Sequence, residues 1–190
     1  MHKKFINMQK HFKTITTHRH QVCKWCFKMG IPWRGLMHDL SKYSKIEFSI
    51  YEYYTDGKRS PHDEAREQLG YSPSWLHHYH HNKHHWEFWL DSKNGTSEFI
   101  PIKMPYKYVI EMFCDRVGAC IVYEGENFTQ NSPLNYYNKF YNKILLHEDT
   151  RALLEILLEA FSSIGPTMFV RWYKETKKDL RRAYAEGLNK

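Results

Sequence analysis

The sequence lacks the features that mark secreted and membrane-spanning proteins. It contains no run of about 18 apolar residues, so we predict no transmembrane helix and no membrane contact. Residues 1–13 are polar and basic and lack the apolar core of a signal peptide. The chain has only 4 cysteines in 190 residues, well below the density of a secreted disulfide scaffold. Together these absences favour a reduced, cytoplasmic protein.

Internal repeats, low-complexity tracts and clear strand patterns are also missing from the sequence. Apolar residues instead recur at helical spacing, and glycine and proline separate the segments. We therefore predict an all-α fold in a single domain over residues 1–190. The expected helices cover about residues 11–29, 33–40, 41–51, 63–70, 72–89, 106–123, 136–146, 150–163 and 166–185. The expected loops cover residues 55–62, 91–105 and 124–135.

Acidic residues are fewer than basic ones, with 21 Asp and Glu against 28 Lys and Arg, so the formal net charge is +7. This excess favours an anionic partner, either a phosphorylated small molecule or a nucleic acid, although a merely soluble basic surface explains it equally well. The basic side chains of the last predicted helix and the Tyr- and Asn-rich segment 135–142 are the candidates for nucleic-acid contact. Exposed tyrosine and tryptophan make a homodimer a reasonable expectation.

What the sequence has in excess is histidine, with 13 residues of this type. Six of them fall within residues 77–85, on the helix predicted over 72–89. Imidazole nitrogens are common metal ligands, whereas a plain solvated surface usually carries lysine and glutamate. The alternative is a polar face with incidental metal affinity. A continuous helix would present two adjacent faces, one with His78, Asn82 and His85 and the other with His77, His81 and His84.

Three further features carry metal-binding side chains on other predicted helices. His18 lies one turn before Val22 and therefore shares the inward face of the first helix. His38 and Asp39 form an adjacent pair on the second helix, where the alternative is a surface pair at a helix start. Asp115 is a carboxylate in an otherwise apolar helix, where burial requires a cation or hydrogen-bond donors. Imidazole and carboxylate together suit zinc, iron, manganese or nickel.

The chain order of these residues resembles that of the HD-domain metal-dependent phosphohydrolase superfamily. More closely, the sequence is similar to an uncharacterised bacterial and phage family of HD-like proteins. The matching segments are THR at 17–19, GLMHDLSKYS at 35–44, GYS at 70–72, WLHH at 75–78, NKHHWE at 82–87, MP at 104–105 and EMFCDR at 111–116. The resemblance implies an HD-domain-like helical bundle with its metal-site core over about residues 10–125 and additional C-terminal helices over about 136–187.

The resemblance also implies a set of metal ligands. The primary ligands would be His18, His38, Asp39 and Asp115. Asp39 would bridge two ions in a binuclear site. The second ion would take its ligands from the histidine-rich segment, with His78 and His85 preferred and His77 and His84 as the close alternatives. Because this segment is denser in histidine than the superfamily usually is, the choice among them and the presence of a second ion stay open. The implied cofactor is one or two divalent ions of Mn, Fe, Ni, Zn or Mg.

The activity implied by the resemblance is metal-dependent hydrolysis of a nucleotide or another small phosphoester. Asp39 and Lys42 would be catalytic. Lys42 would offset the charge on phosphate oxygens, and Lys83 and Arg116 are the second choices for that role. Glu87 or a further carboxylate would orient water or a ligating histidine. The alternatives are an HD-like di-iron oxygenase, a non-catalytic nucleic-acid-binding or interaction protein, and a metal-binding protein with a degenerate site.

Overall fold

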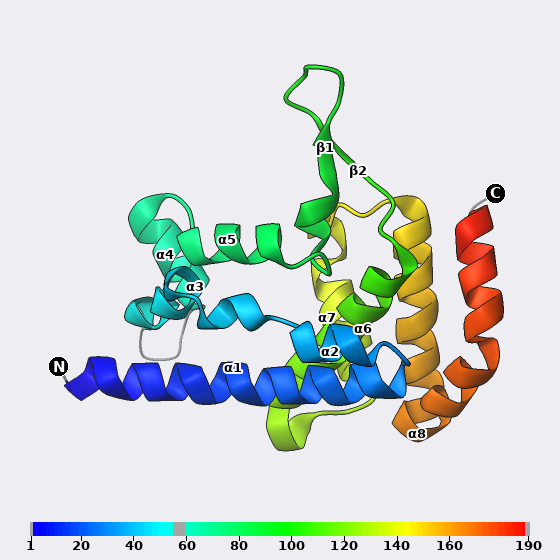
Figure 1. The fold of residues 1–190 in the computed structure, drawn as a ribbon, viewed down its shortest axis with the longest axis horizontal. Helices are drawn as coiled ribbons and strands as arrows, with labels where there is room; N and C mark the ends of the chain where they lie inside the picture. Colours follow the sequence, from blue (N-terminus) through cyan, green and yellow to red (C-terminus); the bar gives the residue numbers. More distant parts are fainter. Residues whose placement is uncertain (1, 55–59, 189–190) are drawn as a thin grey trace.

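The computed structural model describes residues 2–54 and 60–188, and most of them are helical (Figure 1). The α-helices are α1 (His2–Lys28), α2 (Pro32–Met37), α3 (Lys45–Phe48), α4 (Pro61–Leu69), α5 (Pro73–His81), α6 (Tyr106–Glu124), α7 (Ser132–Phe140) and α8 (Glu148–Glu186). Short 3₁₀ helices lie between them, namely η1 (Leu40–Tyr43), η2 (Ser49–Tyr53), η3 (Trp86–Trp89), η4 (Gly125–Asn127) and η5 (Tyr141–Lys143). Strands in the described residues are limited to β1 (Leu90–Ser92) and β2 (Phe99–Pro101), which confirms the predicted all-α class.

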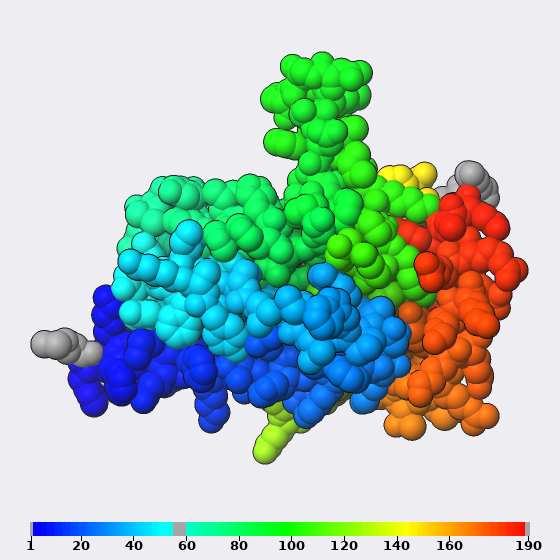
Figure 2. Space-filling view, viewed as in Figure 1, coloured from blue at the N-terminus to red at the C-terminus, as the bar shows by residue number. Residues whose placement is uncertain are grey.

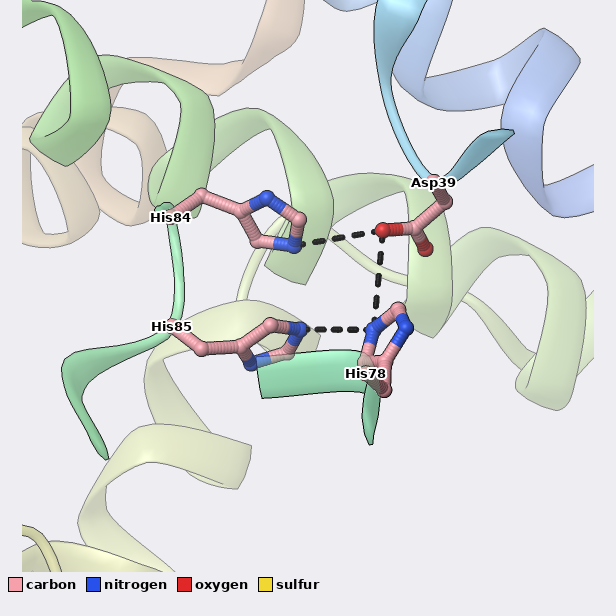
Figure 3. Close-up of side chains that lie close together, drawn as sticks. All are labelled: Asp39, His78, His84 and His85. Carbon is pink, nitrogen blue, oxygen red and sulfur yellow. Dashed lines mark hydrogen bonds and ion pairs between the residues drawn. The ribbon is translucent and has the colours of Figure 1, made fainter. Parts of the chain in front are cut away.

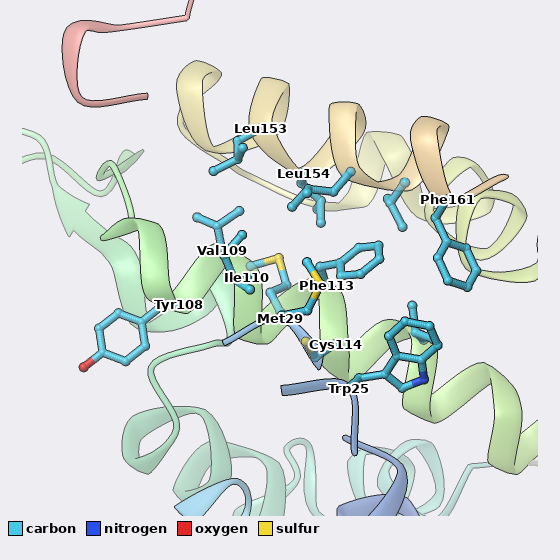
Figure 4. Close-up of a cluster of buried hydrophobic side chains, with 14 of the residues drawn as sticks. Trp25, Met29, Tyr108, Val109, Ile110, Phe113, Cys114, Leu153, Leu154 and Phe161 are labelled. Atoms are coloured by element: carbon cyan, nitrogen blue, oxygen red, sulfur yellow. The ribbon is translucent and has the colours of Figure 1, made fainter. Parts of the chain in front are cut away.

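The hydrophobic core lies around α6, which packs against both α1 and α8 (Figure 4). A helix that is apolar on nearly every side is stable only when other elements surround it, and burial of its apolar surface is the main favourable term in folding. The side chains that meet there are Val22, Trp25, Cys26 and Met29 of α1, Val109, Ile110, Phe113 and Val117 of α6, and Leu153, Leu154, Leu157, Leu158 and Phe161 of α8.

A glycine allows α1 and α6 to approach closely beside the candidate site. A Cβ atom at Gly118 on α6 would lie 2.7 Å from Cγ2 of Val22 on α1. A packed interior does not tolerate such a contact, so a larger residue would push the two helices apart. His18 lies one turn before Val22, and Asp115 lies one turn before Gly118. The close approach therefore brings His18 and Asp115 together.

Gly165 divides α8 into two halves. Its φ of 73° and ψ of 167° are not helical, Pro166 follows it, and the second half folds back along the first (Figure 1). Across the two halves, Tyr184 Oη lies 3.2 Å from Thr150 Oγ1. The predicted interruption of the helix at Gly165 and the new start at Pro166 are confirmed.

α8 is also the one helix in the described part of the chain that is long and apolar enough, by length and composition alone, to cross a membrane. The sequence-based expectation of no such helix rested on unbroken apolar runs, and polar residues interrupt those of α8. In the structure, the leucines of its first half are fully buried in the core that it shares with α6.

α5 ends at His81, which corrects the predicted helix over 72–89. Asn82 takes an extended conformation with φ −123° and ψ 99°. Its side-chain amide donates to the carbonyl of His78 at 2.8 Å and to Ser41 Oγ at 2.6 Å. Asparagine competes with helical structure through such bonds from its side chain. The histidines after position 82 therefore belong to a turn, and the two continuous helical faces predicted for this segment are wrong.

Other boundaries differ from the prediction without changing the helical class. α1 begins at His2, earlier than expected, and α2 ends at Met37, before the expected end near residue 40. The predicted loop over 91–105 contains parts of the β1–β2 hairpin, which projects from the body of the molecule (Figure 2). Of the predicted loop over 55–62, residues 55–59 lie outside the described residues.

Candidate metal centre

Asp39 occupies a tight turn between α2 and η1. Its φ of 53° and ψ of 27° are left-handed, a conformation that aspartate adopts more readily than most residues. Arg19 of α1 holds the turn, because its Nε donates to the carbonyl of His38 at 2.7 Å and its Nη2 donates to the carbonyl of Leu36 at 3.0 Å. This irregular backbone lets the side chains of two adjacent residues, His38 and Asp39, reach the same place.

The first group of candidate ligands lies on one side of the Asp39 carboxylate. His18 Nε2 lies 3.0 Å from Asp115 Oδ1 and 3.5 Å from Asp39 Oδ2. His38 Nε2 lies 3.3 Å from Asp39 Oδ2 and 3.5 Å from Asp115 Oδ1. His18, His38 and Asp39 are buried, whereas the side chain of Asp115 is 21% exposed. All four primary ligands that the resemblance implies therefore meet at one point.

The second group lies on the other side of the same carboxylate (Figure 3). His78 comes from α5, whereas His84 and His85 come from the turn that follows it. His78 Nε2 and His84 Nε2 each lie 3.5 Å from Asp39 Oδ1. His85 Nε2 lies 2.8 Å from His78 Nε2. The premature end of α5 is what allows the turn to carry His84 and His85 back toward Asp39.

The spacing and the burial of these atoms fit a metal ion. Ligand atoms about 2.0–2.2 Å from one ion lie about 2.8–3.6 Å apart at octahedral or tetrahedral angles. The contacts of the first group fall between 3.0 and 3.5 Å. Asp39 Oδ1 and both ring nitrogens of His84 are buried without a hydrogen-bond partner, which is costly unless a cation binds them. The described residues thus contain buried clusters of His, Asp and Glu that can hold a metal ion.

Two buried glutamates that were not predicted as site residues contact the Nδ1 atoms of His38 and His78. Glu111 Oε1 lies 3.1 Å from His38 Nδ1, while its Oε2 accepts a hydrogen bond from Arg34 Nε at 2.7 Å. Glu47 Oε2 lies 2.7 Å from His78 Nδ1. A carboxylate in this position fixes the orientation of the ring and directs Nε2 toward an ion.

The sequence contains a signal for one of these glutamates. Glu111 precedes Asp115 by four residues in an apolar helix, a spacing that places both carboxylates on one face. Glu47 has no such signal, because its contact with His78 depends on how α3 packs against α5. Glu111 also belongs to a third group of candidate ligands, with His38 and His84.

Burial and charge act in opposite directions on the carboxylates. Burial opposes the ionised form of Asp39, but neighbouring cations, His38 first, outweigh it and hold the pKa of Asp39 well below its usual range. His18 and His38 lower the pKa of Asp115 in the same way against burial. Burial dominates at His85 and holds the pKa of that ring well below its usual range. Neutral imidazole is the form that binds a metal ion, and burial favours this form at His85. At His38, neighbouring carboxylates, Asp39 first, outweigh burial and raise the pKa well above its usual range, so an ion that binds there would displace a proton.

His77 lies apart from the other predicted ligands. Its Nδ1 lies 2.7 Å from Oε1 of Glu47, and its ring stacks on His81 with the ring centroids 3.9 Å apart. It belongs to none of the ligand groups found among the described residues. The structure brings the remaining predicted ligands together, including both the preferred His85 and its alternative His84.

The predicted catalytic side chains lie in different surroundings. Lys42 Nζ lies 2.7 Å from Asp39 Oδ2, and so it faces the candidate ligands. Glu87 Oε2 is buried without a hydrogen-bond partner, and burial raises the pKa of this carboxyl. The carboxylates that contact the histidine rings are Glu111 and Glu47, and the orientation of water by Glu87 stays a prediction. Lys83, a second choice for phosphate contact, is exposed and lies over the ring of Phe88.

A pocket of about 610 Å³ lies beside the cluster, and His84, His85 and Asp115 form part of its wall. Its volume is in the range of about 300–1,000 Å³ that small-molecule sites occupy. Aromatic side chains line much of the remainder, namely Trp75, Trp86, Tyr123, Tyr136 and Phe140. Charged side chains are interspersed with them, namely Arg66, Glu87, Arg116, Glu124 and Lys143. The cluster is therefore reachable from a cavity large enough for a small substrate.

Comparisons with known proteins assign the chain to a family but to no activity. No curated protein and no solved structure matches it. A family model matches residues 7–160, a range that includes every residue of the three ligand groups. The chain belongs to this family of unknown function, DUF5662.

Proposed function

We propose that this protein is a metal-dependent phosphohydrolase that acts on a nucleotide or another small phosphoester. The observation that carries the proposal is the position of Asp39. Its Oδ2 faces His18 and His38 at 3.5 and 3.3 Å, and its Oδ1 faces His78 and His84, each at 3.5 Å. A carboxylate between two pairs of imidazoles suits a site for two neighbouring ions. These residues also carry the resemblance to the HD-domain superfamily.

The residues around the cluster would prepare it for one or two ions of Mn, Fe, Ni, Zn or Mg. Bound there, a divalent ion would supply a Lewis acid that acidifies water and offsets charge on a phosphoryl oxygen. Glu111 and Glu47 accept the Nδ1 protons of His38 and His78, so that the Nε2 atoms of both rings point inward. The ammonium group of Lys42 offsets part of the negative charge that the carboxylates add to the site.

The pocket supplies the other requirements of phosphoester hydrolysis. Lys143 lies in its wall and can offset charge on phosphate oxygens outside the cluster. A substrate seated in the pocket would therefore present its phosphate to the candidate ligands.

Metal analysis of protein purified without a histidine tag tests the metal site. We expect one or two divalent ions per chain in the wild type and the loss of at least one ion in His18→Gln or Asp115→Asn. His20→Gln is the matched control, because His20 lies on the same helix as His18 but is exposed. A wild-type protein that holds no metal and takes up none of the candidate ions on reconstitution would contradict the proposal.

A substrate panel tests the reaction. Metal-loaded protein is incubated with phosphomonoesters, cyclic nucleotides and nucleoside triphosphates, and released phosphate is measured. We expect hydrolysis of at least one compound and a loss of about 100-fold or more in Asp39→Asn. Oxygen consumption without phosphate release would favour the oxygenase alternative. Salt-dependent binding of oligonucleotides whose affinity these substitutions do not change would favour a nucleic-acid-binding protein.

A further inference from the structure

We propose that the pocket beside the cluster binds a nucleobase and that Arg116 and Glu87 read its edge. The inference rests on the proposed function, since it assigns the part of the substrate that does not react. It selects nucleotides from the wider class of small phosphoesters.

The walls of the pocket suit a flat aromatic group. Trp75 and Trp86 line it from the side of α5 and η3, and Tyr136 and Phe140 line it from α7, where their ring centroids lie 4.9 Å apart. Nucleobases stack on such side chains, with a contribution of about 1–3 kcal/mol per base. An acyclic phosphoester or a sugar phosphate would leave these apolar faces without a partner of similar shape.

Two polar groups in the same wall have unused hydrogen-bonding capacity. Arg116 Nε and Glu87 Oε2 are buried, and neither atom has a hydrogen-bond partner. The first is a donor and the second is an acceptor, and leaving either without a partner is costly. A ligand that offers both an acceptor and an N–H donor would satisfy both groups. The edge of a nucleobase carries an acceptor and an N–H donor side by side. Arginine and glutamate side chains hydrogen-bond to such edges in protein–nucleic acid complexes.

The position of the pocket decides which end of a bound nucleotide lies beside the candidate metal ligands. His84, His85 and Asp115 belong both to its wall and to the candidate ligand groups. A base between the aromatic side chains therefore leaves the sugar and phosphate to extend toward the cluster. Arg116 adjoins Asp115 in the chain, so base recognition and the phosphate-facing side chains share one stretch of α6.

Tryptophan fluorescence gives a test that needs neither metal nor hydrolysis, because Trp75 and Trp86 line the pocket. Wild-type protein in chelator is titrated with guanosine, adenosine, cytidine and uridine, and with ribose and phenyl phosphate as ligands that lack a base edge. We expect saturable quenching by at least one nucleoside, no saturable quenching by ribose, and weaker binding of phenyl phosphate than of that nucleoside.

Substitutions then test the two edge-reading residues. Glu87→Met and Arg116→Met keep the length of each side chain and remove its polar group, and we expect each to weaken nucleoside binding tenfold or more. Glu126→Met and Arg171→Met are the matched controls, because both residues are exposed and lie outside the pocket wall. Circular dichroism of each variant verifies that the fold is retained, and Glu87→Leu, which also removes the acceptor, serves as a second variant if Glu87→Met does not fold.

The outcomes separate this inference from the proposed function. No saturable nucleoside binding, or binding unchanged in both Met variants, would overturn the inference even if the protein hydrolyses another phosphoester. Tighter binding of phenyl phosphate than of every nucleoside would also overturn it. Nucleoside binding that depends on Glu87 and Arg116 would support it even if no phosphate is released, in which case the proposed reaction alone would fail.

Discussion

At the scale of single residues, the candidate site depends on buried carboxylates as much as on histidines. Glu111 is fully buried, and it binds both His38 and Arg34. A carboxylate in such a place is tolerated only because charged and polar partners compensate for its lost hydration. Its neighbours lower the pKa of Glu111 to about 2 against the effect of burial, so it is ionised at neutral pH. It can therefore hold the His38 ring in one orientation.

Glu111→Gln tests this positioning role. The amide keeps the size of the side chain but removes the charge that faces His38 Nδ1, so we expect metal affinity to fall by about 10–100-fold. Isothermal titration with the preferred ion measures the change. Glu155→Gln is the control, because Glu155 accepts a hydrogen bond from Tyr137 away from the cluster. Equal metal affinity in Glu111→Gln and the wild type would contradict the assigned role.

His11 makes stability depend on pH. Burial, with a smaller contribution from Lys42, lowers the pKa of His11 to about 4 in the folded protein. The unfolded chain, with a pKa of about 6.5 for histidine, then binds more protons as pH falls below 6.5. The contribution of a neutral His11 is therefore fully present above pH 6.5 and is lost as pH falls toward 4.

Urea unfolding of metal-free protein at pH 7 and pH 4.5 measures this loss. We expect the free energy of unfolding to fall by about 2 kcal/mol more in the wild type than in His11→Phe, which has no titrating ring at this position. His20→Phe, at an exposed site on the same helix, is expected to follow the wild type. An equal fall in the wild type and His11→Phe would count against a buried neutral His11.

At the scale of elements, helix ends and helix contacts position the ligands. α5 stops at His81 because the side chain of Asn82 bonds to the His78 carbonyl and to Ser41. The turn that follows then carries His84 to the Asp39 carboxylate. Periodicity alone favoured a longer helix, since nothing in the spacing of apolar residues reveals a hydrogen bond between a side chain and a distant loop.

Gly118→Ala tests the contact between α1 and α6. The added methyl group would meet Val22 Cγ2, so we expect a loss of about 1–3 kcal/mol in the free energy of unfolding. Val22→Ala removes the opposing methyl groups, and the double variant should recover at least about 1 kcal/mol relative to the sum of the single effects. Urea unfolding of all four proteins measures this coupling. Strictly additive effects would mean that the two helices do not depend on this contact.

At the scale of the whole molecule, the candidate ligands come from segments far apart in the chain. His18 lies on α1, Asp39 in the turn after α2, His78 on α5 and Asp115 on α6. An unfolded chain cannot hold the side chains of either ligand group around an ion, so an ion that binds the folded protein would stabilise it by mass action. Metal binding at this site would therefore be linked to folding.

A thermal shift measures that linkage. At a free ion concentration of about 100 times Kd, we expect a gain of about 2.7 kcal/mol, which corresponds to a rise of about 5–10 °C in Tm for a chain of this size. Asp115→Asn should lose most of the rise, whereas His20→Gln should keep it. A Tm that is the same in chelator and in saturating metal would contradict a site shared by these segments.

The sequence alone determined the helical class and most of the candidate ligands of this protein. Helical periodicity is a local property, and the residue types that bind metals are visible wherever they stand in the chain. Only the tertiary structure decided how these residues are arranged. It decided which histidines face Asp39, and it placed Glu47 and Glu111 behind the histidine rings and a pocket beside the cluster. These features arise from packing between distant segments, such as α3 on α5 and α1 on α6. Spacing within one segment carries no information about such contacts.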